Sequence, residues 1–120
     1  MQVPKGPGPP TKTVKFLCGG EETEIVVSEF SDRFFILITQ LGKIGSLVEA
    51  SCDCLTNGVF SVRTVLGDRK KEGLQLLGRV LIEHIAQSTS KPVLFGFSLK
   101  DSSPNAVMGV AEDFRNRIQF

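Results

Sequence analysis

The stretch that most constrains this chain is residues 33–48, RFFILITQLGKIGSLV, in which two apolar segments flank a short glycine-bounded loop. Its first part, residues 34–38, is rich in aromatic and β-branched types, which favours a central strand covered on both faces. Gly42 and Gly45 would supply the positive φ that a tight reversal needs, so residues 46–50 are expected to return antiparallel. The sequence therefore predicts a hairpin in the middle of a sheet.

Other segments also have strand patterns. They are bounded by turn signals, with Gly19-Gly20 and Asn57-Gly58 as the clearest turns. Because the strands before residue 67 follow one another through short connections with no helix between them, we expect an antiparallel meander. The predicted strands are residues 13–18, 23–30, 34–38, 46–50, 59–66 and 93–99.

Two segments have helical periodicity. The first follows the charged patch at residues 67–72 and extends to about Gln87, and Leu76, Val80 and Ile82 widen its apolar stripe beyond what one sheet contact requires, which predicts a protein interface. The second helix begins after a capping Ser103, with Pro104 in its first turn. The stripes comprise Leu74, Leu77, Leu81 and Ile85 in the first helix, and Val107, Val110, Ala111, Phe114 and Ile118 in the second. The predicted fold class is α+β: an antiparallel sheet or sandwich of about six strands with two amphipathic helices packed against it.

Composition limits the chain to one folded domain. The 120 residues are 41% hydrophobic, enough for one core, and we place the domain at residues 13–120 after a disordered Pro/Gly-rich tail at 1–12. The net charge of +1 provides no overall field that would attract nucleic acid or an anionic membrane. The three cysteines show no zinc-type pattern, and we recognise no signal peptide or membrane span. We therefore expect a reduced intracellular compartment, the cytoplasm and also the nucleus.

The chain offers few catalytic groups. His84 flanks the apolar face of the first helix without a nucleophile at a known spacing, and Ser98 lacks the glycine that a nucleophile elbow requires. Cys52 and Cys54 could ligate a metal or form a strained disulfide, but no cluster of further ligands is visible, so ordinary thiols are expected. The carboxylates are scattered singly. The sequence therefore predicts no enzyme, no metal site and no cofactor.

The loop Gly42-Lys43-Ile44-Gly45 has an apolar residue near its tip, where turns normally carry polar ones. Ile44 could cover the domain's own core, or it could contact another protein with Lys43 beside it. A GxxG loop with a basic residue also clamps nucleic acid in KH domains, but that loop joins helices and lies in a basic groove. A small RNA-binding module remains the alternative to a protein-binding one.

Residues 36–48, ILITQLGKIGSLV, closely resemble the signature hairpin of the proteasome assembly chaperone 3 family: an apolar strand, Thr-Gln, a Gly-Lys-apolar-Gly loop, and Ser or Thr before Leu-Val. Further matches follow in the family's order, at residues 65–67, 91–94 and 100–101. The resemblance covers about residues 13–101. The Pro-rich tail and Cys52-Asp53-Cys54 depart from the family pattern.

This resemblance implies a non-enzymatic chaperone that promotes assembly of the 20S proteasome. Such a chaperone binds proteasome α subunits, assists formation of the α-ring and is then released. It works as a homodimer or as a heterodimer with the fourth assembly chaperone. We expect the Gly42–Gly45 loop and the surface at Leu76, Val80 and Ile82 to contact these partners.

Overall fold

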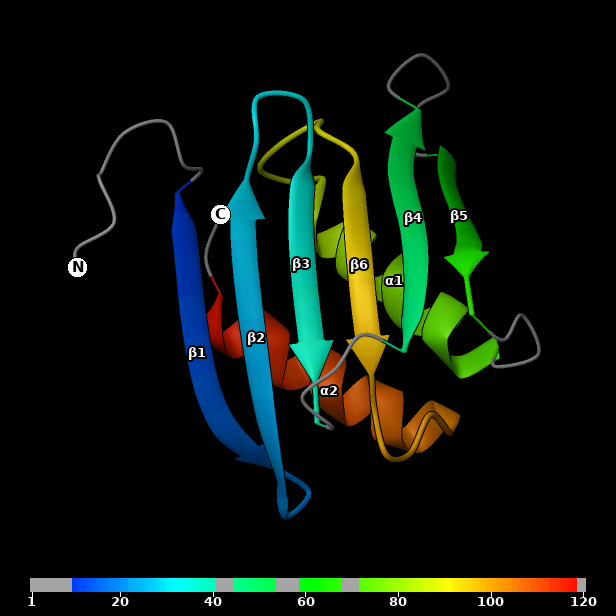
Figure 1. Ribbon diagram of the computed structural model, residues 1–120. Helices are drawn as coiled ribbons and strands as arrows, with labels where there is room; N and C mark the ends of the chain where they lie inside the picture. The colour runs from blue at the N-terminus through cyan, green and yellow to red at the C-terminus, as the bar shows by residue number, and fades with distance from the viewer. Residues whose placement is uncertain (1–9, 41–44, 54–58, 68–71, 119–120) are drawn as a thin grey trace.

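Six strands form one sheet in the order β1-β2-β3-β6-β4-β5, with both helices on one side of it (Figure 1). The computed structural model describes residues 10–40, 45–53, 59–67 and 72–118. The strands are β1 Thr11–Cys18, β2 Glu21–Glu29, β3 Phe34–Thr39, β4 Ser46–Asp53, β5 Val59–Leu66 and β6 Val93–Ser98, and the helices are α1 Glu72–Ile85 and α2 Pro104–Arg117. The predicted α+β class with about six strands and two helices is confirmed.

The pairing of β3 and β4 differs from the prediction. Strands β1, β2 and β3 form an antiparallel meander, and β4 pairs antiparallel with β5. The predicted direct hairpin between β3 and β4 is wrong because β6 lies between them, parallel to β3 and antiparallel to β4. A parallel neighbour needs a long crossover, and the chain that runs through β4, β5 and α1 provides one. Strand β3 nevertheless lies in the interior of the sheet, as predicted.

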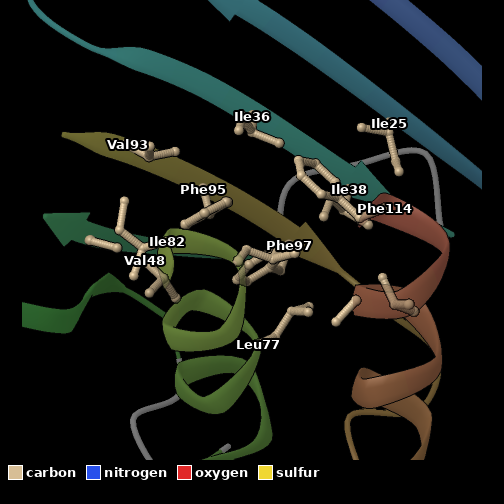
Figure 2. Packing of buried hydrophobic residues seen from close by; sticks show 14 of the residues in the cluster. Ile25, Ile36, Ile38, Val48, Leu77, Ile82, Val93, Phe95, Phe97 and Phe114 are labelled. Carbon is tan, nitrogen blue, oxygen red and sulfur yellow. The ribbon is translucent and has the colours of Figure 1, made fainter. Parts of the chain in front are cut away.

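The core lies between the sheet and the helices, as Figure 2 shows. Alternate residues of the interior strands point into this layer, and large side chains of α1 and α2 meet them there. Within this one chain, the prediction that β3 is covered on both faces is wrong, since Phe35 and Leu37 are only half-buried while their neighbours are buried. The labelled core residues are Ile25, Ile36, Ile38, Val48, Leu77, Ile82, Val93, Phe95, Phe97 and Phe114.

The two helices begin and end close to their predicted limits. Helix α1 ends at Ile85, before the predicted Gln87. Helix α2 begins at Pro104, but the Ser103 side chain makes no capping hydrogen bond; instead the Ser103 N–H donates to Asp101 Oδ1 at 2.9 Å. This hydrogen bond also holds the pKa of Asp101 below its usual range. The apolar stripe of α2 is buried as predicted, including Ile118 just after the helix.

Candidate protein-interaction surface

The loop that the sequence singled out lies mostly outside the described residues. Gly42, Lys43 and Ile44 are not among them, whereas Gly45 is described and exposed. The Gly45 N–H donates to the Phe97 carbonyl at 3.1 Å, and a Cβ at this position would also come within 3.1 Å of that oxygen. Gly45 does not have the positive φ expected of it. Its small size instead permits the close approach of the two backbones.

Gln40, the last described residue before this loop, is held at three points. Its backbone N–H donates to the Ser98 carbonyl at 2.7 Å, and its side-chain Nε2 donates to Thr23 Oγ1 at 3.1 Å. Its Oε1 accepts a hydrogen bond from the Lys100 N–H at 3.0 Å. Lys100 is also paired with Glu21 at 2.7 Å. Hydrogen bonds with three residues, Thr23 on β2, Ser98 at the end of β6 and Lys100 just after it, therefore fix the point at which the loop leaves β3.

The start of β4 and the end of β5 meet at the same end of the sheet. A Cβ on Gly67, which has a φ of 114°, would lie 2.5 Å from Ser46 Oγ, so this position requires glycine. Leu66 pairs with Leu47 and is 63% exposed. The described parts of the segments that carry the family resemblance, residues 39–40 and 45–46, 65–67 and 100–101, are thus brought together in space.

The sheet face opposite the helices has an apolar centre. We define the open-face patch as Val26, Phe35, Leu37, Leu47 and Leu94, all of which are half-buried. The strand register makes them neighbours: Val26 lies opposite Leu37, Phe35 lies opposite Leu94, and Leu37 and Leu47 both lie opposite Gly96. Neither α1 nor α2 covers this face, which is turned toward the viewer in Figure 1.

A charged pair lies on each of two sides of the open-face patch. Arg63 Nε lies 3.0 Å from Glu49 Oε1 on β4, and Lys15 Nζ lies 3.8 Å from Glu24 Oε2 on β2. An apolar centre with a polar rim is the usual anatomy of a protein interface. Sequence reasoning missed this patch because it assumed that β3 was covered on both faces. The continuous apolar run at residues 34–38, which places apolar side chains on both faces of the strand, was the signal that could have indicated it.

The predicted surface on α1 is only partly available to a partner. Leu76 is 37% exposed, and Val80 is half-buried and packs against the core cluster. Ile82 is 1% exposed, because α1 turns this residue toward the sheet, where Figure 2 shows it beside Val48. Its side chain therefore has no surface to offer. Met108 on α2, which the sequence did not single out, is 40% exposed.

The side chains that were considered for catalysis are packed against or buried by other parts of the chain. The His84 ring packs edge-on against Phe114, with centroids 6.4 Å apart and an interplanar angle of 87°. Ser98 is 4% exposed. Cys52 is half-buried and Cys54 lies outside the described residues. Among the residues that the structure describes, no group of His, Cys, Asp and Glu could hold a metal ion, and no helix could cross a membrane.

The Cys18 thiol has a perturbed pKa. Burial raises the pKa of the Cys18 thiol to about 11, and the hydrogen bond and negative charge of Asp113 act in the same direction, opposed by the charge of Arg117. Arg117 itself lies over the Phe16 ring, 4.3 Å from its centroid. A thiol held protonated is a poor nucleophile. This cluster therefore fastens the end of α2 to β1 and does not form a reactive centre.

Comparison with known proteins gives a consistent result. The model of the family Proteasome assembly chaperone 3 matches residues 36–116. Proteasome assembly chaperone 3 of Bos taurus is 30% identical over 99 residues, covering 78% of this chain and 80% of the bovine protein. The same protein of Mus musculus is 26% identical over 101 residues, covering 80% of this chain and 82% of the mouse protein.

A solved structure has the same fold. It is a chain from the crystal structure of a novel chaperone complex for yeast 20S proteasome assembly, with a TM-score of 0.64 over 88% of this chain and 95% of that chain. At 14% sequence identity this likeness concerns the fold alone. The family match covers most of the sheet and both helices. The chain therefore belongs to the proteasome assembly chaperone 3 family.

Proposed function

We propose that this chain is a non-enzymatic chaperone that binds α subunits of the 20S proteasome, promotes formation of the α-ring and is released before the particle is complete. It acts in the cytoplasm and the nucleus, as a homodimer or with the fourth assembly chaperone. Family membership supports the role in proteasome assembly. The yeast structural neighbour comes from a chaperone complex, which supports action with a partner. These comparisons lend no support to the RNA-binding alternative.

The observation that carries the proposal is the open-face patch. A sheet with helices on one side usually needs its other face to be polar, or covered. Here the uncovered face has five apolar side chains at adjacent positions of four strands, with the charged pairs Glu49–Arg63 and Lys15–Glu24 at its margins. This arrangement fits a partner protein better than it fits a small substrate.

The partner that best matches this face is a second sheet of the same kind. Two sheets pack face to face at about 10 Å with interdigitated side chains. A specific dimer buries roughly 1,200–2,000 Å² in total, with a mostly apolar centre. We therefore assign the dimer contact to the open-face patch. The exposed Leu76 and the half-buried Val80 of α1 then remain available on the opposite side of the molecule.

Sedimentation of two matched variants tests the dimer contact. Leu37→Glu places a charge in the centre of the patch, whereas Leu76→Glu places one on the exposed surface of α1. We expect the wild-type chain and the Leu76→Glu variant to sediment as dimers, alone or mixed with the fourth chaperone, and Leu37→Glu to sediment as a folded monomer. Leu94→Lys, in the adjacent row of the patch, should behave like Leu37→Glu. Dimers that persist in both patch variants would contradict the assignment.

Capture from a cell extract tests the function itself. A tagged chain should retain proteasome α subunits, identified by mass spectrometry, and should retain them in high salt after nuclease treatment. Salt-sensitive retention of RNA without α subunits would instead favour the RNA-binding module. Capture that yields neither α subunits nor another assembly chaperone would reject the proposed function.

A further inference from the structure

The two edges of the sheet differ in their chemistry. Strand β1 forms one edge and β5 the other, at opposite sides of Figure 1. The β1 edge carries Lys12 and Lys15, both exposed, and charged side chains on an edge strand discourage pairing with another chain. On β5, Arg63 is the one charged residue among the described side chains, 60–66. The β5 edge thus has fewer charged side chains to discourage pairing than the β1 edge has.

The single charge on β5 is neutralised within the chain. Arg63 donates from Nε to Glu49 Oε1 at 3.0 Å, on the strand opposite. Phe60 and Val62 are half-buried against the core, and Val65 and Leu66 are 48% and 63% exposed. The edge of β5 is therefore apolar and nearly neutral, and its outer main-chain groups face no other described strand.

We propose that the outer edge of β5 receives an extended segment of a client protein, which pairs through main-chain hydrogen bonds and adds a strand to the sheet. Strand addition of this kind takes its affinity from the main chain and its specificity from alternate side chains. The shift in register at the end of β5, where Val48 pairs with Thr64 and Leu47 with Leu66, limits the regular edge to residues 59–64. The segment would pair there.

The side chains of β5 define the segment that fits. On the helix side, Phe60 and Val62 favour apolar neighbours, since cross-strand apolar pairs stabilise a sheet. On the other side, an acidic or uncharged residue fits opposite Arg63, whereas a basic one is disfavoured. The identification of this client as a proteasome α subunit rests on the proposed function.

A second copy of β5 is a poor occupant of this edge. In an antiparallel pair, residues directly opposite each other point to the same face. A two-fold axis near the middle of β5, at Val62 or Arg63, would therefore set the two Arg63 side chains diagonally adjacent or directly opposite. Like charges in such positions destabilise strand pairing. The edge therefore favours a foreign strand, and the open-face patch remains free for dimer formation at the same time.

Two lysine substitutions test this inference in the full-length chain. Ser61→Lys places a charge in the middle of the β5 edge, and Thr13→Lys places the same charge on the β1 edge; both native side chains are exposed. We expect Ser61→Lys to weaken capture of α subunits by about tenfold or more, the scale of one interface hot spot, and Thr13→Lys to leave it unchanged. Hydrogen exchange should show slower exchange of β5 amides when an α subunit is bound, with β1 amides unaffected.

Each outcome decides the inference. Full capture by a folded Ser61→Lys variant, with no slowing of exchange in β5, would overturn it. Loss of self-association in that variant without loss of capture would assign β5 to a second copy and would also overturn it. If the wild-type chain captures no α subunit, the proposed function fails separately. The β5 edge is then tested separately, by measuring hydrogen exchange of the chain with and without a synthetic peptide of alternating valine and threonine with one aspartate. If the peptide does not slow the exchange of the β5 amides, the inference is rejected.

Discussion

Gly78 of α1 lies directly against Val48 of β4: a Cβ at position 78 would come within 3.1 Å of Val48 Cγ1. Gly109 of α2 differs, since a Cβ there would meet nothing within 4 Å. Replacing a glycine inside a helix by alanine usually stabilises it by roughly 0.5–1 kcal/mol. We expect that gain from Gly109→Ala and not from Gly78→Ala, because Val48 must shift to accommodate the added methyl group. Urea denaturation measures both, and equal gains would show that α1 approaches the sheet more loosely than described.

Leu81 and Leu76 provide a matched pair for testing the core. Leu81 is fully buried, whereas Leu76 on the same helix is 37% exposed. Leu81→Ala removes buried surface and leaves a cavity, so it should lower the free energy of unfolding by about 2–5 kcal/mol. Leu76→Ala should change it by well under half as much. An unchanged denaturation midpoint for Leu81→Ala, with an unchanged slope, would contradict its place in the core.

Replacing Gln40 by alanine should lower the stability of the fold more than replacing Gln75, because the Gln40 side chain makes more hydrogen bonds. The Gln40 side chain makes two hydrogen bonds, to Thr23 and from Lys100, whereas Gln75 donates one to Thr64 at 3.0 Å. Gln40→Ala should cost about 1–3 kcal/mol of stability, and Gln75→Ala about 0.5–1.5 kcal/mol. Thermal and urea unfolding compare them. A cost for Gln75→Ala that equals or exceeds that for Gln40→Ala would refute the anchoring role of Gln40.

The Cys18 thiol predicts a specific pH dependence. The folded pKa of about 11 lies above the ordinary value of 9.0, so the protonated thiol stabilises the fold below pH 9.0, and this contribution is lost as the pH rises toward 11. A Cys18→Ala variant should lack the part of the stability loss above pH 9.0 that comes from this thiol. Alkylation of Cys18 at pH 8, followed by mass spectrometry, should be slow, and Asp113→Asn should accelerate it by lowering the pKa. Fast alkylation in the native chain would contradict the burial of this thiol.

The loop between β3 and β4 yields a prediction that rests on the sequence alone. If Lys43 and Ile44 contact a client, the double change Lys43→Glu with Ile44→Ser should abolish α-subunit capture while the melting temperature stays constant. If Ile44 covers the chain's own core instead, stability should fall by about 1–3 kcal/mol. Full capture by a stably folded double variant would refute the contact.

The sequence predicts local structure well here because each element has its own periodicity. The alternating strands and the stripes of Leu77 in α1 and Phe114 in α2 have the expected burial. Strand pairing between residues far apart leaves no local signal, so β3 and β4 look like a hairpin although β6 separates them. Periodicity also fixes the width of an apolar stripe but not its rotation about the helix axis. For that reason Leu76 and Ile82 could not be distinguished before the contact of Gly78 with the sheet was known.

The position of β6 between β3 and β4 has a consequence for synthesis of the chain. The ribosome synthesises β3 and β4 before β6. Phe34 and Ala50 can therefore be joined into one sheet only after Val93, which pairs with both, has been made. Until then the nascent chain holds two separate partial sheets, and the inner borders of β3 and β4 are unpaired. Such borders readily bind one another or other chains. A message truncated before residue 93 would therefore produce an aggregation-prone fragment, and nascent-chain quality control should recognise it.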